Sequence, residues 1–212
     1  MKLTRTHFLL GLAGAARLAA QDRPNMLRYE RQPFTVPDFQ AEGHILDIGG
    51  GGEGIIGRMK PRQVVAIDLY KEELLQAPPG PLKIVMDATE MHFLDGQFNT
   101  ATAFFSLMYM KPEVQRKVFA ETFRVLKSGG RWLVWDACIP TAPNQNTKGP
   151  IYYFEFHLPA ETVNTGYGTF WPAQAMDLAY YRSLASSSGF QVISAREQDG
   201  HFRTFHMELR KS

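Results

Sequence analysis

The feature that most constrains the fold of this chain is a run of glycines that separates an apolar segment from an apolar helix start. Residues 44–46 are typical of a short buried strand, residues 49–52 are four consecutive glycines, and residues 55–59 can begin a helix. In an α/β sheet, a strand, a glycine loop and a helix in this order form a ligand site at the C-terminal edge of the strand. Glycine lacks Cβ and permits positive φ, so a ligand can lie against the bare backbone. Because an ordinary turn needs only one or two glycines, we interpret this run as a binding loop.

Strand and helix patterns alternate after the glycine run, which predicts a mostly parallel sheet covered on both faces. The helix at 112–126 begins with a proline in its first turn, and Lys127 to Gly130 are expected to cap its end. The expected strands are residues 63–68, 82–87, 98–105 and 131–136, and the expected helices are residues 71–76 and 112–126.

The pattern changes after Asp136, where a segment rich in proline, glycine and aromatic residues covers residues 139–172. Within it, residues 151–157 are typical of an inserted strand, and residues 165–172 are expected to form an aromatic-walled loop. A helix over 173–187 should follow, and then two strands over 190–195 and 202–209. Only a few residues join these two strands, so they must be antiparallel. We therefore expect a Rossmann-like, doubly wound α/β fold with a mostly parallel seven-stranded sheet and a C-terminal antiparallel strand pair.

Composition is that of an ordinary globular protein with one domain, because the chain has 212 residues, of which 44% are hydrophobic and 21% charged. The net charge of +2 is too small to indicate a nucleic-acid partner. Cys138 is the single cysteine, so no internal disulfide can form, and we expect it to be a buried apolar residue near a strand end. The histidines are scattered without the spacing of a zinc site, so no metal is expected.

The N-terminus resembles a secretory signal, because Lys2 and Arg5 precede an apolar stretch over 8–16 that small residues follow. A loose amphipathic helix is the alternative. The stretch is too short for an integral membrane span, which needs about 20 apolar residues. We therefore leave residues 1–21 out of the fold and expect one domain over 22–212, in which residues 22–42 form an extended lead-in.

Three aspartates end three successive predicted strands, namely Asp47, Asp68 and Asp87. The C-terminal ends of parallel strands lie along one edge, so these carboxylates should line one crevice. A single acid in such a place could simply cap the following turn. Three in register favour a ligand with several hydroxyl and amine donors.

Two classes of ligand compete for this crevice. Gly49, Gly51 and Gly54 match the dinucleotide fingerprint, and Asp68 lies at about the expected distance of 20 residues, which would suit an NAD-dependent oxidoreductase. However, a pyrophosphate needs positive potential at the helix start, whereas Glu53 and Asp47 would repel it. The same carboxylates favour a ligand that carries positive charge.

Four motifs in order resemble those of the class I S-adenosylmethionine-dependent methyltransferases. Residues 45–51 with Gly54 are similar to the first motif of that family, 65–68 to its second-strand motif and 85–88 to its adenine-contacting motif. Residues 123–133 are similar to its segment before the fifth strand, with Ser128 in place of a proline. The resemblance departs from the family at Glu53, where the last glycine of the loop is usual.

The resemblance implies S-adenosylmethionine as cofactor and a role for each matched residue. Asp47 and the amides near Gly49 and Gly51 would hold the methionine part, beside Glu53. The ribose would bind Asp68, and Leu69 or Met86 would pack on the adenine. Asp87 would bind the adenine amino group, and the Ala88 amide would bind a ring nitrogen. The carbonyls of Phe105 and Ser106 would accept hydrogen bonds from the ammonium.

A methyltransferase of this kind mainly holds the acceptor in line with the methyl group, and a base is needed only for a protonated nucleophile. The acceptor site should lie beneath residues 109–111 and the segment 139–172, whose aromatic residues favour a small, partly apolar acceptor. Apolar loops of this kind could also make homodimer contacts. The candidates for a base or an orienting group are Tyr109, Glu155, His157 and Tyr167.

Two other functions stay open from the sequence: an NAD-dependent oxidoreductase, and a non-catalytic domain that binds S-adenosylmethionine without using it. The cofactor is made in the cytoplasm, which favours a cytoplasmic location. The signal-like N-terminus leaves export or membrane tethering open.

Overall fold

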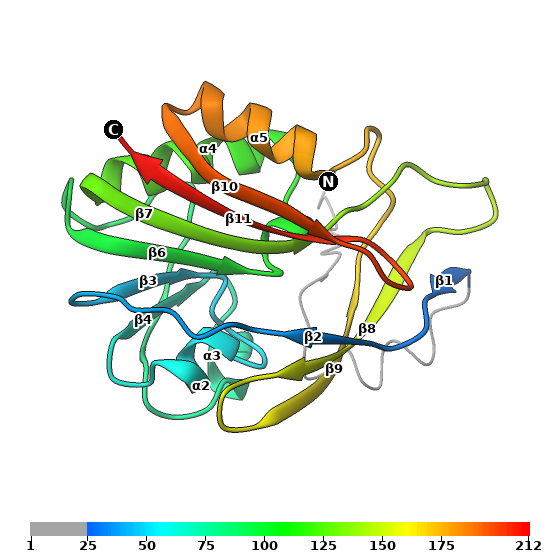
Figure 1. The fold of residues 1–212 in the computed structure, drawn as a ribbon, viewed down its shortest axis with the longest axis horizontal. Coiled ribbons are helices and arrows are strands. Elements are labelled where there is room, and N and C mark those ends of the chain that lie inside the picture. Colours follow the sequence, from blue (N-terminus) through cyan, green and yellow to red (C-terminus); the bar gives the residue numbers. More distant parts are fainter. Residues whose placement is uncertain (1–24) are drawn as a thin grey trace, which may run out of the picture.

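The structure is a computed structural model that describes residues 25–212 of the chain (Figure 1). The signal-like segment predicted over residues 1–21 lies outside these described residues. Among residues 25–212, no helix combines the length and the apolar character needed to cross a membrane.

A seven-stranded sheet forms the centre of the molecule in the order β10-β11-β7-β6-β3-β4-β5. The five strands from β7 to β5 are parallel, whereas β11 is antiparallel to both β7 and β10. This arrangement confirms the predicted mostly parallel sheet with its C-terminal antiparallel strands. The strands are β3 (Ile45–Ile48), β4 (Val64–Asp68), β5 (Leu82–Val85), β6 (Phe98–Phe104), β7 (Leu126–Ala137), β10 (Phe190–Gln198) and β11 (Thr204–Lys211).

Helices flank the two halves of this sheet. The helices are α2 (Ile55–Met59), α3 (Lys71–Gln76), α4 (Pro112–Val125) and α5 (Leu178–Ser187), with a short 3-10 helix, η1 (Leu107–Tyr109). In Figure 1, α4 and α5 lie side by side next to β7 and β10, and α2 and α3 lie near β3 and β4. The inner face of α4 buries Val118, Phe119 and Val125, which is the spacing that predicted this helix.

Two helix boundaries differ from the predicted ones. Residues 127–130 do not cap α4 but belong to β7, where they form a bulge opposite β6. Helix α5 begins five residues later than predicted, at Leu178, because the side chain of Asp177 accepts the Tyr180 amide and caps its first turn. Met176, just before this cap, pairs with Ile139 in a β-bridge instead.

A second, smaller sheet was not predicted. It is formed by β1 (Met26–Arg28), β2 (Gln32–Thr35), β8 (Gly149–His157) and β9 (Thr162–Gly168). The expected inserted strand is β8, which is parallel to β1 and β2 on one side and antiparallel to β9 on the other. The predictions of an extended lead-in over 22–42 and of a loop over 165–172 are therefore wrong in part, since both segments contain strands.

The two sheets share one core. Phe34 of β2 and Phe154 and Phe156 of β8 pack against Phe104 and Phe105 at the end of β6, with ring centroids of Phe105 and Phe154 4.6 Å apart. All five side chains are buried. The small sheet therefore packs directly against the C-terminal edge of the large sheet, where the ligand site was expected. Cys138, which follows β7, is buried as predicted.

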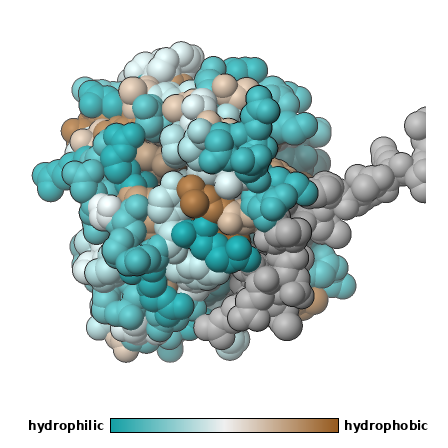
Figure 2. Space-filling view, turned by 90° about the vertical axis from the view of Figure 1, so that its right-hand side faces the viewer, coloured by the Kyte–Doolittle hydropathy of each residue, from teal (hydrophilic) through white to brown (hydrophobic). Residues whose placement is uncertain are grey.

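The face on the right of Figure 1 carries mostly hydrophilic residues, as Figure 2 shows, with apolar residues in small separate patches. This view of the described residues does not by itself indicate a dimer surface. The predicted homodimer therefore stays a hypothesis.

Candidate functional site

A cavity of about 510 Å³ lies at the C-terminal edge of β3, β4 and β6, between the large sheet and β9. Its floor is the glycine loop, and its walls come from the ends of β4 and β6, from η1 and the start of α4, and from β9. Of the predicted cofactor residues, the cavity is lined by Gly49, Gly51, Glu53, Asp68, Leu69, Asp87, Ala88, Phe105 and Ser106. Met86 and two of the candidate acceptor residues, Tyr109 and Tyr167, line it as well.

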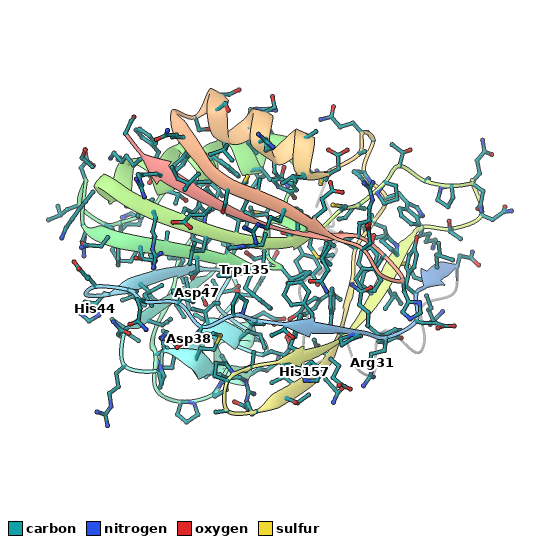
Figure 3. All side chains as sticks on the ribbon, viewed as in Figure 1. Arg31, Asp38, His44, Asp47, Trp135 and His157 are labelled. Atoms are coloured by element: carbon teal, nitrogen blue, oxygen red, sulfur yellow. The ribbon has the colours of Figure 1, made fainter. Side chains whose placement is uncertain are left out.

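Asp47 is the predicted cofactor residue that the structure does not bring into the cavity. It lies within β3, is 2% exposed, and accepts a 2.7 Å hydrogen bond from the Thr102 hydroxyl (Figure 3). A Cβ on Gly50 would lie 2.6 Å from an Asp47 carboxylate oxygen, so this acid packs beneath the loop. The structure thus gives Asp47 a part in shaping the loop and no direct access to a ligand.

His157 and Glu155 are also outside the cavity. Alternate residues of β8 face opposite ways, so Phe154 and Phe156 are buried while Glu155 and His157 point away from the core. His157 instead pairs with Glu155 at 3.0 Å, with both side chains about 40% exposed. Figure 3 shows His157 on the small sheet, well apart from Asp47. The structure therefore places this pair outside the cavity, and a role in orienting an acceptor is not supported by its position.

The glycine loop is packed so closely that side chains would not fit. At Gly49, φ is +72° and a Cβ would lie 2.5 Å from the Cβ of Ser106. A Cβ on Gly51 would lie 2.5 Å from the Cβ of Glu73 and 2.8 Å from an Asp68 carboxylate oxygen. Glycine is thus required here by sterics, and the loop presents bare backbone to the cavity.

Most amides of this loop already have partners within the protein. The amides of Gly49 and Gly50 both donate to the Ile67 carbonyl, at 2.9 and 3.1 Å. The Gly52 amide donates to the Glu73 carbonyl, and the Gly54 amide to the Gly51 carbonyl. The Gly49 amide is therefore already bonded within the protein, and the role implied for the amides near Gly49 and Gly51 stays a prediction. A pyrophosphate binds to free backbone amides, and these four loop amides are not free to bind one.

Asp68 and Asp87 each cap a turn and also line the cavity. One carboxylate oxygen of Asp68 accepts the Tyr70 amide at 2.9 Å, and one of Asp87 accepts the Thr89 amide at 2.8 Å. Burial raises the pKa of Asp68, although hydrogen bonds from the Tyr70, Gly51 and Leu69 amides oppose this shift. Both acids therefore cap a turn, which was the simpler alternative considered for each of them. Because both also line the cavity, they remain available to a ligand.

Negative charge predominates around the cavity. Among the described residues that line it, the carboxylates are Glu53, Asp68, Glu73, Asp87 and Glu113, and the basic side chain is Lys111. Sequence reasoning missed Phe104, Glu113 and Val114, although the first turn of a helix after a parallel strand faces the same edge. The described residues contain no group of three or more His, Cys, Asp or Glu side chains able to hold a metal ion.

Glu53 joins the glycine loop to the small sheet. Its carboxylate accepts hydrogen bonds from the hydroxyls of Thr165 and Tyr167 on β9, the latter at 3.2 Å. Arg58 adds a second link, because its guanidinium donates to the Glu53 carbonyl at 2.7 Å and pairs with Glu161 at 2.9 Å. The residue that departs from the family pattern is therefore the one that connects the loop to β9.

Asp136, at the end of β7, is a fully buried acid that sequence reasoning did not assign to the site. Its carboxylate accepts the Met108 amide at 3.0 Å and the Ala137 amide at 2.8 Å, which fixes η1 beside the cavity. Asp136 is a fourth acid at the end of a predicted strand, so the sequence pattern that indicated Asp47, Asp68 and Asp87 also applied to it.

The pH dependence of stability should follow from Asp47 and Asp136. Burial raises the pKa of both carboxyls to about 7, whereas the unfolded chain has aspartate pKa values of about 4. The folded state then holds more protons than the unfolded state, so the free energy of unfolding increases as pH falls from 8 to 6.5. We expect the Tm to rise by several degrees over this interval, measured by thermal denaturation.

Asp136→Asn keeps an oxygen that can accept the Met108 amide, and it should remove about half of this pH dependence. The interval stops at 6.5 because burial lowers the pKa of His206, which acts in the opposite direction below that pH. A Tm that is constant or falls between pH 8 and 6.5 would contradict the burial of these acids.

Comparison with known proteins adds to this picture. Residues 46–134 match the family model of a methyltransferase domain. No curated protein sequence matches the chain significantly.

Solved structures with the same fold include an S-adenosylmethionine-dependent methyltransferase from Methanosarcina mazei, at 20% identity and a TM-score of 0.59, which covers 82% of this chain and 94% of that one. A second structure is the 1,6-didemethyltoxoflavin-N1-methyltransferase of Burkholderia thailandensis, solved with 1,6-didemethyltoxoflavin and S-adenosylhomocysteine. It is 14% identical with a TM-score of 0.52, and the match covers 80% of this chain and 72% of that one. The cyclase SpnF is 14% identical with a TM-score of 0.56, covering 81% and 76%. Together with the family match over residues 46–134, the seven-stranded fold agrees with the class I S-adenosylmethionine-dependent methyltransferase family that the sequence motifs resemble.

Proposed function

We propose that the protein transfers the methyl group of S-adenosylmethionine to a small-molecule acceptor. The observation that carries this proposal is the acid-rich cavity above a glycine loop whose amides at Gly49, Gly50, Gly52 and Gly54 are already bonded within the protein. S-adenosylmethionine has no phosphate and carries a sulfonium and an ammonium, so carboxylates favour it and free loop amides are not needed. The same two features disfavour NAD.

The lining residues fit the parts of this cofactor. Asp68 would accept hydrogen bonds from the ribose hydroxyls, and Asp87 with the Ala88 amide would bind the adenine edge. Leu69 and Met86 would pack on the adenine face. The carbonyls of Phe105 and Ser106, where β6 ends, would accept the ammonium. Phe105 has a φ of +49°, which is unusual for a residue other than glycine and is typical of strained positions at functional sites.

The bound cofactor would supply a methyl group already activated by its sulfonium. The protein then has to bind the acceptor in line with that methyl and exclude water. Phe104, Met110 and Val114 line the cavity and provide apolar walls for this purpose. The Burkholderia methyltransferase with the same fold was solved with bound 1,6-didemethyltoxoflavin, a small molecule, and S-adenosylhomocysteine, which supports a small acceptor here.

Asp68→Ala should weaken binding of S-adenosylmethionine by roughly 30-fold, about 2 kcal/mol, through the loss of charge-assisted hydrogen bonds. Asp68→Asn keeps an oxygen for the Tyr70 amide and should weaken binding less. Calorimetric titration of the folded variants measures both. Unchanged affinity in Asp68→Ala would refute the ribose role.

Transfer itself is tested by incubating the full chain with methyl-labelled S-adenosylmethionine and a small-molecule cell extract. We expect label in a low-molecular-weight product of the wild type. At a limiting concentration of S-adenosylmethionine, the Asp68→Ala variant should give no labelled product. Cofactor binding without any transfer of label would instead indicate a non-catalytic binding domain. The assay for transfer is needed because fold alone does not fix the reaction. SpnF has the same fold and is named as a cyclase.

We also propose that the protein acts in the cytoplasm, where the cofactor is made. Fractionation of cells that express the full-length chain tests this, and recovery of the protein outside the cytoplasm would contradict it.

A further inference from the structure

Tyr167 is a polar residue that is almost completely buried and yet lines the open space of the cavity. It lies on β9, is 6% exposed and faces the cavity. Its ring packs between Phe105 and Phe154, each with ring centroids 5.7 Å away. These contacts hold the ring rigidly, so the hydroxyl has a fixed position at the cavity wall.

The direction of the Tyr167 hydroxyl is set by Glu53. The hydroxyl donates to a carboxylate oxygen of Glu53 at 3.2 Å, and Thr165 donates to the other oxygen. Burial and the nearby charge of Glu53 raise the pKa of Tyr167 well above its ordinary value, so the phenol stays protonated. Its one proton is thus committed to Glu53. The Tyr167 oxygen also carries lone pairs, which can accept a hydrogen bond from a ligand.

The surroundings define what this oxygen can bind. Tyr109, Met110 and Val114 give the cavity apolar walls, and the carboxylates of Glu53 and Glu113 make it unfavourable for an anion. A fixed oxygen that can only accept a hydrogen bond selects a ligand with a donor. The cavity therefore suits a small, largely apolar molecule that carries a hydroxyl or amine hydrogen.

We propose that Tyr167, oriented by Glu53, is a positioning residue that selects an acceptor molecule carrying an O–H or N–H donor. The inference rests on the proposed methyl transfer and names the chemistry of its acceptor. It also changes the expected role of Tyr167, because a tyrosine held in the protonated form is a hydrogen-bond acceptor and not a base.

The test is a binding measurement on the full chain saturated with S-adenosylhomocysteine. The probes are phenol, which carries an O–H, aniline, which carries an N–H, and anisole, which has the same ring and no donor. We expect phenol or aniline to bind at least about tenfold more tightly than anisole, since a site built around a hydrogen bond rejects the analogue that lacks it. A preference for phenol alone or for aniline alone identifies the donor that Tyr167 selects as a hydroxyl or an amine.

Two variants separate the hydroxyl of Tyr167 from general effects on packing. Tyr167→Phe keeps the ring and should abolish the preference for a donor while keeping the affinity for S-adenosylhomocysteine. Tyr152→Phe is the matched control, because Tyr152 is the buried partner of Tyr167 across β8 and β9 and lies outside the cavity. It should keep the full preference.

The outcomes distinguish this inference from the function on which it rests. Failure of folded wild type to bind S-adenosylhomocysteine would overturn the proposed function, and the inference with it. Normal cofactor binding with equal affinity for the three probes, or with no binding of any probe, would overturn the inference alone. So would a preference that persists unchanged in Tyr167→Phe.

Discussion

Gly49→Ala should weaken the binding of S-adenosylmethionine by about 100-fold, or roughly 3 kcal/mol. The φ of +72° at this position is costly for any residue with a Cβ, and the new Cβ would lie 2.5 Å from the Cβ of Ser106. Ser106 cannot easily move, because its hydroxyl donates to the Ile48 carbonyl at 2.7 Å. The loop must therefore shift, and with it the backbone surface against which the cofactor would lie. Calorimetric titration of the folded variant measures the loss.

Gly43→Ala is the matched control for this prediction. Gly43 has a similar φ of +66°, but nothing lies within 4 Å of its added Cβ, and it does not line the cavity. It should lower stability slightly through backbone strain and leave the affinity for S-adenosylmethionine unchanged. If Gly49→Ala binds as tightly as Gly43→Ala, the close contact between the loop and Ser106 is not needed for the site.

Phe154→Ala should lower the free energy of unfolding by about 3–5 kcal/mol, and the Tm by roughly 10 °C. The side chain is fully buried on β8. Its ring centroid lies 4.6 Å from that of Phe105 at the end of β6 and 5.0 Å from that of Phe202, next to β11. Its removal leaves a cavity between the two sheets. Because one core spans both sheets, we expect a single cooperative transition that moves to lower temperature as a whole.

Leu82→Ala controls for the loss of an apolar side chain, because Leu82 lies on β5 and is 60% exposed. It should shift the Tm much less than Phe154→Ala. Two separate transitions in Phe154→Ala, with the upper one at the wild-type temperature, would show that the small sheet is a separate unit. Calorimetric scanning distinguishes these results, and it also tests the prediction of a single domain over residues 22–212.

The sequence predicted the large sheet well because its signals are local. Apolar runs such as residues 63–68, the helical spacing of residues 112–126 and the glycine loop each fall within one short window. The handful of residues between the last two strands also fixed their antiparallel pairing. Helix boundaries were less accurate where a single capping side chain, Asp177, decided them.

The small sheet could not be predicted in the same way, because its pairing is long-range. Strand β1 has three residues and no periodicity, and it becomes a strand only because β8 lies beside it more than a hundred residues later. The predicted loop over 165–172 contains Tyr167 on a strand for the same reason. Pairing across such distances is decided by tertiary packing, which sequence pattern does not show.

Site residues were predictable where the family motif fixed their place, as with Asp68, Asp87 and Ser106, all of which line the cavity. The position of Asp47 was misjudged because an acid at a strand end can point beneath the loop as easily as into the crevice. The bond between Glu53 and Tyr167 joins residues 114 positions apart and has no sequence signature. The inference about the acceptor depends on this contact, which only the structure shows.

The most direct test of the central claim is calorimetric titration of the folded wild-type chain with S-adenosylmethionine, S-adenosylhomocysteine and NADH in parallel. The acid-rich cavity and the bonded loop amides predict that both sulfur compounds bind with a stoichiometry of about one and that NADH does not bind. Binding of NADH, or no binding of either sulfur compound by protein whose thermal unfolding is cooperative, would contradict the account.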